Sequence, residues 1–399
     1  MKKYSFVEFF CGAGGSHLGF KKEGSYETIL ASDIDDEMCE VIKLNNPEIS
    51  NVLCDDINNL ANKNLLKIIN LKKGELDVMF GGVVCKGFSL AGVRSSSDER
   101  NLLYRPYIDI VNQLKPKISI IENVPGMKTM TIQDNPSGKE KKEIDFAWKQ
   151  LEKLNGLKSS QTKGTASKET IKLIKQIETN REEYRNTVKK GSLKVVDDII
   201  KRYNDIGYHV IKPEILKASD YGAATTRSRL IIIAIRNDLD YSIFNFPPTY
   251  KRKHKTVGQA LKKVNYNKKN DLDNLPMNHA EKTIKRFKYI PEGKNIQTVI
   301  DTLPDDLKIS KFYSRGSTMR LSRFDPAPTL VPGHSNFPVH PTLNRCITVR
   351  EAATIMGFPQ NYKFIGSHTK RCEQVGQAVV MEMAYAIAKS CSEFLNKVD

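Results

Sequence analysis

The sequence lacks several patterns that mark common protein classes. Its seven cysteines, at positions 11, 39, 54, 85, 346, 372 and 391, form no CxxC pair and no cluster with histidine at metal-ligand spacing. We therefore expect a reducing compartment and no metal site. No stretch reaches about 18 uncharged apolar residues, and the amino terminus MKKYSFVEFF has no long apolar core before a cleavage site. These absences predict a cytosolic protein with no membrane partner.

Acidic residues are few relative to basic ones. The 399 residues include 63 Lys and Arg against 46 Asp and Glu, a formal net charge of +17. Such an excess favours a polyanionic partner such as nucleic acid. A compositional bias toward Lys and Asn gives the same number, so the charge leaves both interpretations open.

The first part of the chain alternates short apolar runs with segments of helical period. This alternation predicts an α/β fold, in which helices cover both faces of a parallel sheet. Ligands of such sheets bind just beyond the carboxyl ends of the strands. The predicted strands are 4–10, 28–32, 52–54, 77–80 and 118–122, and the predicted helices begin near 16, 37 and 102.

Composition changes divide the chain into parts. Residues 1–236 read as a main domain that carries a Lys-rich helical insertion at about 128–191. The insertion is either a solvated helix pair or an added nucleic-acid contact surface. Residues 237–344 are rich in Pro, Asn and Lys and predict a smaller, irregular domain. From 345 to 399 the helical period returns, which predicts a return to the main domain.

The stretch FVEFFCGAGGSHLGF predicts a strand that runs through a glycine loop into a helix. His17 occupies the place of the third glycine of a dinucleotide fingerprint, and no Gly-Lys-Ser/Thr ending marks a phosphate-binding loop. Asp33 and Asp56 follow the next two strands. Glycines and two acids at three successive strand ends predict a site for a nucleoside cofactor.

The loop GGVVCKGFSLAG places Cys85 after the fourth strand, on the same ligand-binding edge. A cysteine alone is more often a packing residue. Glu122 ends the following strand in IIENVPG, where a carboxylate indicates function. Arg227 and Arg229, two residues apart at a strand start, share one face. They are either site residues or an edge-strand charge pair.

The order of these segments resembles the DNA cytosine-5 methyltransferase family. FFCGAGG is similar to its first cofactor motif, GGVVCKGFS to its nucleophile loop and ENVPG to its Glu-Asn-Val motif. TTRSR, TVREAATIMGFP and QVGQAV resemble its three later motifs in the same order. The resemblance implies a Rossmann-like S-adenosylmethionine-dependent methyltransferase sheet and a smaller target-recognition domain at 237–344.

The resemblance also implies the site residues. S-adenosyl-L-methionine is the expected cofactor, with S-adenosyl-L-homocysteine as product. The residues implied to line its site are Phe10, Gly12, Ala13, Gly14, Gly15, Asp33, Ile34, Asp56, Ile57, Gly82, Leu103, Gln377, Ala378 and Val379. The residues implied to surround the target base are Cys85, Glu122, Arg227 and Arg229.

Each of these residues has a chemical role under the resemblance. Carbon 5 of cytosine is a poor nucleophile until the thiolate of Cys85 adds to carbon 6. Glu122 would then protonate or hydrogen-bond ring nitrogen 3 as negative charge develops there. Arg229 would hold oxygen 2, and Arg227 would support Glu122 or a flanking phosphate. This chemistry requires the base to be flipped out of the duplex, at a cost of a few kcal/mol.

We expect double-stranded DNA as the partner, bound by a monomer, with a restriction endonuclease that acts on the same site as a candidate second partner. The expected readers of bases or phosphates are Ser89 and Arg94 in the loop after the nucleophile, and Arg315, Ser317, Arg320 and Arg323 in the irregular region.

The chain departs from the family pattern at four positions. Val84 and Lys86 flank the cysteine in place of proline and glutamine, Thr225 replaces a glutamine, and Gln377 replaces an asparagine. We hypothesise that Gln377 partly restores a hydrogen bond that Thr225 cannot make. Two alternatives stay open: a cytosine-5 methyltransferase that acts on RNA, and a DNA-binding relative with weak or redirected activity.

Overall fold

The computed structural model describes residues 3–83, 102–133, 138–162, 167–190, 192–250, 253–267, 271–310, 316–331, 333 and 337–398. The chain divides into two compact units. We call Met1–Val83, Arg105–Pro125 and Tyr203–Asp399 the sheet unit. Val84–Tyr104 and Gly126–Arg202 form the insertion unit.

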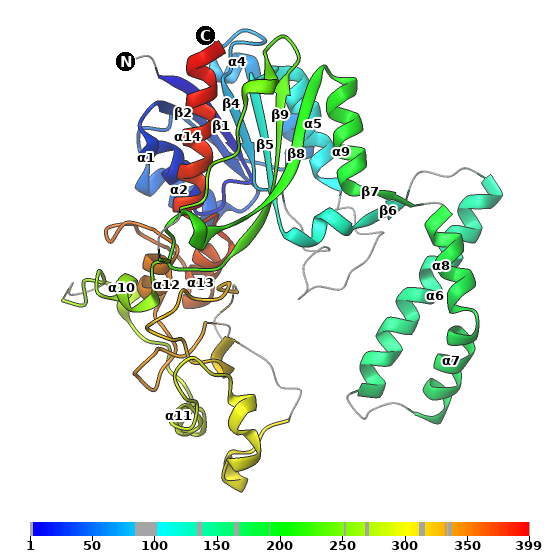
Figure 1. Ribbon diagram of the computed structural model, residues 1–399, viewed down its shortest axis with the longest axis vertical. Coiled ribbons are helices and arrows are strands. Elements are labelled where there is room, and N and C mark those ends of the chain that lie inside the picture. Colours follow the sequence, from blue (N-terminus) through cyan, green and yellow to red (C-terminus); the bar gives the residue numbers. More distant parts are fainter. Residues whose placement is uncertain are drawn as a thin grey trace. The chain divides into compact units, whose positions relative to one another are not determined.

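A seven-stranded sheet forms the centre of the sheet unit (Figure 1). Its strands lie in the order β3 (Asn51–Cys54), β2 (Tyr26–Asp33), β1 (Tyr4–Phe9), β4 (Val78–Gly81), β5 (Ile118–Asn123), β9 (Ser228–Arg236) and β8 (Tyr208–Lys217). The first five strands are parallel, which confirms the predicted α/β class.

The strand β9 lies outside the part of the chain for which the sequence predicts a parallel sheet, and its direction is different. This strand pairs antiparallel with both of its neighbours, β5 and β8. Only a short link, which includes the turn η3 (Ala218–Tyr221), joins β8 to β9. A link of that length can connect antiparallel neighbours but cannot cross over to make a parallel pair.

The central strands are apolar because the sheet is covered on both faces. Every residue of β4 and β5 is buried, including Glu122 and Asn123 at the end of β5. Among the covering helices, α5 (Tyr104–Leu114) reaches the sheet through Tyr107, whose hydroxyl donates to the Ile120 carbonyl at 2.9 Å. Such strands read as continuous apolar runs in the sequence, as observed.

The last helix, α14 (Met381–Val398), packs against the first, α1 (Gly15–Glu23) (Figure 1). A side chain at Gly19 would collide with Ala384, so glycine permits the close approach. The Tyr26 hydroxyl on β2 donates to the Ala388 carbonyl at 2.8 Å. The two ends of the chain therefore share one core.

Residues 237–344 contain few regular elements, as the sequence predicts. A small core joins Phe287, Ile290, Ile296, Val339 and Cys346 with neighbouring apolar side chains. Other side chains of this region, such as Leu321, Leu330 and Phe337, belong to the main core of the sheet unit. The elements are α10 (Val257–Leu261), α11 (Glu281–Phe287) and the 3-10 turns η4 (Tyr241–Ile243), η5 (Leu272–Asn274), η6 (Ile296–Thr302), η7 (Asp305–Leu307) and η8 (Gly316–Thr318).

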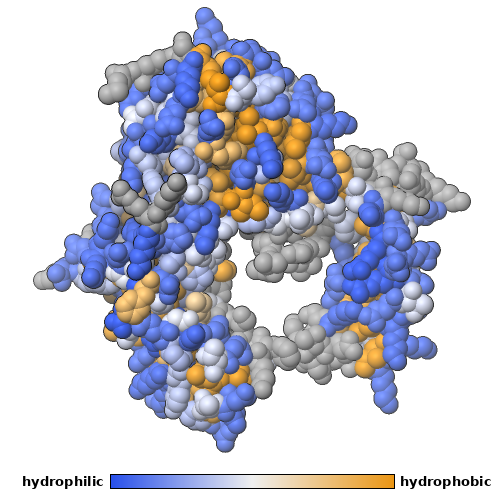
Figure 2. All heavy atoms as spheres, in the orientation of Figure 1, coloured by the Kyte–Doolittle hydropathy of each residue, from blue (hydrophilic) through white to orange (hydrophobic). Residues whose placement is uncertain are grey.

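The insertion unit contains α6 (Gly138–Thr162), α7 (Lys168–Thr179) and α8 (Arg181–Lys190), with β6 (Thr131–Gln133) paired antiparallel to β7 (Ser192–Lys194). Asn180 separates α7 from α8. Leu154, Ile174 and Ile177 form the core of this unit. Hydrophilic side chains cover most of the face of these helices seen in Figure 2.

One boundary between the two units falls within the helix α9 (Val195–Asp205), between Arg202 and Tyr203.

No helix in the described ranges combines the length and the apolar composition needed to cross a membrane.

Candidate active site

The carboxyl ends of five parallel strands meet at one edge of the sheet. The glycine loop follows β1, Asp33 ends β2, Asp56 follows β3, Gly82 follows β4 and Glu122 lies at the end of β5. Because β9 runs in the opposite direction, its first residues reach the same edge. This edge is where an α/β sheet binds its ligands.

The glycine loop has a left-handed backbone that side chains rarely adopt. Gly12 has a φ of 50° and Gly14 a φ of 80°. Gly15 begins α1 and lies so close to the Val379 carbonyl oxygen that any side chain there would collide with it. The loop therefore packs directly against the segment that precedes α14.

Asp33 holds the glycine loop in place. Its Oδ2 accepts a hydrogen bond from the Gly12 amide at 2.8 Å, and its Oδ1 accepts one from the Asp35 amide at 3.1 Å. Burial is the main cause that raises the pKa of this carboxyl. The neighbouring Ile34 is 63% exposed, which is unusual for a large apolar side chain. An acid beside an exposed apolar surface can bind both the sugar and the flat face of a nucleoside.

The other acid and its neighbour occupy the start of the next helix. Asp56 caps α3 (Ile57–Ala61) by accepting from the Asn58 amide at 2.8 Å, and it remains half-buried. Ile57 is buried. Phe10, half-buried with a φ of 54°, leads from β1 into the loop, and Gly82 donates from its amide to the Phe9 carbonyl at 3.3 Å.

Two residues that the sequence reasoning missed support the same loop. The Tyr362 hydroxyl donates to the Ala13 carbonyl at 2.7 Å. Glu8, on β1 beneath the loop, is fully buried and accepts a hydrogen bond from the Ser16 hydroxyl. Burial raises the pKa of Glu8 to about 8. Glu8 lies in the stretch FVEFFCGAGG, where a carboxylate within an apolar strand is a signal that could have identified it, whereas Tyr362 lies outside the motifs quoted above.

Glu122 and Arg229 form an ion pair at the sheet edge. Arg229 Nε lies 2.8 Å from Glu122 Oε1, and only about a tenth of each side chain is exposed. Arg229 Nη1 also donates to the Ser228 carbonyl at 2.8 Å. A side chain added at Gly82 would place its Cβ 3.8 Å from Glu122 Oε2, so the end of β4 approaches this carboxylate closely.

Asn123 ties the end of β5 to the end of β4. Its Nδ2 donates to the Val83 carbonyl at 3.1 Å, and its Oδ1 accepts from the Val124 amide at 2.8 Å. Val83 is the last described residue before Cys85. Cys85, Ser89 and Arg94 lie outside the described residues. Leu103 is half-buried and belongs to the insertion unit.

Arg229 is the arginine that pairs with Glu122, and the role expected of Arg227, support of Glu122 or of a flanking phosphate, stays a prediction. Arg227 is buried and donates from Nη1 to the Gly376 carbonyl at 2.9 Å and from Nη2 to the Gln377 carbonyl at 3.2 Å. These carbonyls end α13 (His368–Gln377), where a cation complements the helix dipole.

The closing segment after α13 lies between Arg227 and the glycine loop. Ala378 and Val379 are buried, whereas the Gln377 side chain is exposed. Thr225 is buried, and its hydroxyl donates to the Pro328 carbonyl at 3.2 Å. The Arg227 amide donates to the same Thr225 oxygen at 3.3 Å. Arg227 therefore links the two residues: its amide bonds to the Thr225 side chain, and its guanidinium bonds to the Gln377 backbone carbonyl.

Arg320, expected to read a base or phosphate, is instead buried in the irregular region. Its guanidinium donates to the carbonyls of Phe287, Ile290, His340 and Leu343 and to Asn344 Oδ1, at 2.5 to 2.9 Å. Burial lowers its pKa. All its donors serve the fold, because a buried guanidinium must have partners.

The remaining predicted readers differ in their surroundings. Arg323 is half-exposed and pairs with Glu292, with Nη2 3.0 Å from Oε2. Ser317 is half-buried on η8, beside a small cavity. Arg315 lies outside the described residues. Within the part of the chain that the structure describes, no group of three His, Cys, Asp or Glu side chains could hold a metal ion.

Comparisons with known proteins agree with this arrangement. The model of the family of C-5 cytosine-specific DNA methylases matches residues 4–154 and 159–393. Two curated relatives are the type II methyltransferases M.PspPI of a Psychrobacter strain, 28% identical, and M.Eco47II of Escherichia coli, 27% identical. Each alignment covers 99% of this chain and 80% of the relative.

Solved structures show the same fold at lower identity. A chain from an Escherichia coli prophage, described as a DNA modification methyltransferase, is 22% identical with a TM-score of 0.61. The alignment covers 99% of this chain and 100% of that one. A DNMT2 mutant of Spodoptera frugiperda is 16% identical with a TM-score of 0.55, over 98% and 100% of the two chains.

Proposed function

Because the chain belongs to the family of C-5 cytosine-specific DNA methylases, we propose that the sheet edge described above holds both S-adenosylmethionine and a cytosine flipped out of duplex DNA. The chain is a DNA methyltransferase that modifies cytosine at carbon 5 in a specific sequence. The observation that supports the proposed site best is the Glu122–Arg229 pair, on the same edge as the glycine loop.

The residues at the ends of β1, β2 and β3 fit the cofactor. The left-handed glycines let backbone amides approach a ligand closely, Asp33 has lone pairs left for ribose hydroxyls, and exposed Ile34 offers an apolar face for adenine. Gly82, Asp56 and the closing segment complete the proposed site. When bound, S-adenosylmethionine supplies an electrophilic methyl group.

The protein's part in the reaction is to make carbon 5 nucleophilic. The thiolate of Cys85 forms a bond to carbon 6, and the electron pair of the carbon 5–carbon 6 double bond becomes available at carbon 5. Once carbon 5 carries the methyl group, a base takes the proton from carbon 5. The electron pair of that carbon–hydrogen bond re-forms the carbon 5–carbon 6 double bond, and the sulfur–carbon 6 bond breaks so that Cys85 leaves as the thiolate.

Glu122 and Arg229 orient the base. Glu122 donates a proton to ring nitrogen 3, where negative charge develops, and Arg229 binds oxygen 2 while its contact with Oε1 orients the Glu122 carboxyl group. The pair is preorganised by adjacent strands, so little reorganisation accompanies the chemical step. Arg227 acts differently: it fixes the end of α13, and through it the closing segment against Gly15.

The test compares tritium transfer from labelled S-adenosylmethionine to duplex DNA, to transfer RNA and to buffer alone. We expect incorporation into duplex DNA only. Incorporation into transfer RNA alone would favour the RNA methyltransferase, and DNA binding without incorporation would favour the relative with weak or redirected activity. Methylation-aware sequencing of DNA from cells that express the chain then gives the recognised sequence, at which a partner restriction endonuclease would cut.

A further inference from the structure

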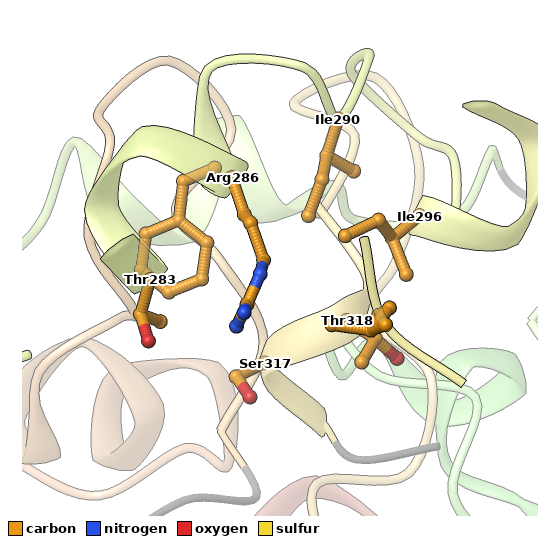
Figure 3. A pocket seen from close by; sticks show the side chains of 8 residues that line it. Thr283, Arg286, Ile290, Ile296, Ser317 and Thr318 are labelled. Atoms are coloured by element: carbon orange, nitrogen blue, oxygen red, sulfur yellow. The ribbon is translucent and has the colours of Figure 1, made fainter. Parts of the chain in front are cut away.

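A small cavity in the irregular region brings one arginine and three hydroxyl-bearing residues together (Figure 3). Thr283 and Arg286 come from α11, and Ser317 comes from η8. In Figure 3 the end of the Arg286 side chain points into the space between Thr283 and Ser317. Thr318, whose Oγ1 accepts a hydrogen bond from Asn295 Nδ2 at 3.2 Å, and apolar side chains that include Ile290 and Ile296 line the rest of the cavity.

Arg286 differs from the two neighbouring arginines that the structure describes. Its Nε donates to the Leu307 carbonyl at 3.0 Å, which anchors the guanidinium by its inner nitrogen. Across the described ranges, no carboxylate lies within ion-pair distance of Arg286, whereas Arg323 is paired with Glu292. Arg320 is saturated by backbone carbonyls. Arg286 therefore has two outer nitrogens available for a ligand.

The size and donors of the cavity identify the ligand group. Its volume is about 20 Å³, near that of one or two water molecules and far below the several hundred Å³ of a pocket that encloses a base. The two outer guanidinium nitrogens and the hydroxyls of Thr283 and Ser317 are hydrogen-bond donors, and a phosphate offers several acceptor oxygens to such a set. A phosphate oxygen fits the mouth of this cavity and a nucleobase does not.

The surrounding sequence favours a polyanion. Residues 237–344 contain 18 Lys and Arg against 10 Asp and Glu. We propose that Arg286, with Thr283 and Ser317, binds a backbone phosphate of the DNA duplex and so positions the irregular region without reading sequence. This proposal rests on the proposed function, since it takes DNA as the substrate. It moves the contact expected of Arg320 to a residue on α11.

The experiment measures DNA affinity by fluorescence anisotropy over a series of NaCl concentrations, on two short duplexes of unrelated sequence. The slope of log K against log salt is negative, and loss of one phosphate contact decreases its magnitude by about 0.9. We expect that decrease for Arg286→Gln on both duplexes, and a slope close to that of the wild type for Arg286→Lys. The matched control is Lys285→Gln, because Lys285 lies on the same helix and its ammonium is 3.0 Å from Glu281. Its slope should equal that of the wild type.

Ser317→Ala provides a second variant, which leaves the guanidinium and its anchor in place. It should weaken binding to both duplexes equally and leave the slope unchanged. Two results would overturn the proposal: an Arg286→Gln slope equal to that of the wild type, or a relaxed methylation sequence in Arg286→Gln, which would indicate base reading. If Arg286→Gln shows the expected change in slope relative to the wild type, but the wild type transfers no methyl group, the proposed function fails while the phosphate site stands.

Discussion

Arg229 Nε and Glu122 Oε1 lie 2.8 Å apart across the antiparallel strands β9 and β5. The pair lies at the only strand junction in the described sheet where an antiparallel strand meets the parallel set. Reversal of β9 is what places the start of that strand, with Arg229, beside the end of β5. The topology thus creates the pair that we propose holds the base.

Replacement of Glu122 by Gln should lower kcat by about 10²-fold to 10⁴-fold, the range typical of a lost acid-base group. The amide keeps the size of the carboxyl, so cofactor affinity should change little. Single-turnover methylation and calorimetric titration with S-adenosylhomocysteine measure the two effects. Equal losses in both would place Glu122 in the cofactor site instead of at the base.

Arg227→Met should weaken S-adenosylhomocysteine binding and lower the free energy of unfolding. Hydrogen bonds to charged groups contribute about 1.5–3 kcal/mol each, and Arg227 donates to two carbonyls at the end of α13. The control is Lys158→Met, which removes an exposed pair with Glu178 and should have little effect on either quantity. Arg227→Lys should recover part of the loss. If Arg227 contacted only the target base, Arg227→Met would leave the affinity for S-adenosylhomocysteine unchanged, and the prediction would be wrong.

Gly15→Ala should damage the contact between the glycine loop and the closing segment. Its methyl group would collide with the Val379 carbonyl, and overpacking of this kind costs about 1–3 kcal/mol. We expect a lower melting temperature and weaker cofactor binding. Gly156→Ala on α6 is the control, because an added Cβ there meets nothing within 4 Å. That substitution should be neutral or slightly stabilising, and a similar loss in both variants would refute the predicted collision.

Glu8 should make stability fall as the pH rises. Its pKa is raised from 4.5 in the unfolded chain to about 8 in the folded protein, mainly by burial. The folded state therefore holds a proton that the unfolded state has released, so stability from this group is complete below pH 4.5 and is lost as the pH rises through about 8. Urea unfolding across this range should show a decline that Glu8→Gln flattens. Parallel declines in both proteins would exclude Glu8 as the cause.

Much of the fold follows from the sequence because buried parallel strands read as unbroken apolar runs. The apolar run that ends at Glu122 predicts a strand end there, and the glycine loop before α1 predicts another. The sequence alone therefore places these site residues at strand ends. Strand direction is different. The apolar period of β9 is the same in either orientation, so its reversal depends on the short link from β8 and escaped the sequence reasoning.

The side-chain partners of individual arginines could not be predicted. Arg320 lies in a polar, irregular stretch that reads as surface, yet carbonyls from several distant segments surround it. Arg286 lies in the Lys-rich run KRFKY and has no motif around it. Tertiary contacts alone distinguish the arginine that stabilises the fold from the one with free donors.

Covalent trapping on DNA that contains 5-fluorocytosine tests the central claim most directly, because fluorine at carbon 5 blocks release of the sulfur–carbon 6 bond. In the presence of S-adenosylmethionine, the wild-type chain should form a denaturation-resistant adduct that mass spectrometry places on Cys85. Cys85→Ala should form none while it still binds S-adenosylhomocysteine. An adduct that persists in Cys85→Ala, or one that maps to another cysteine, would contradict the account.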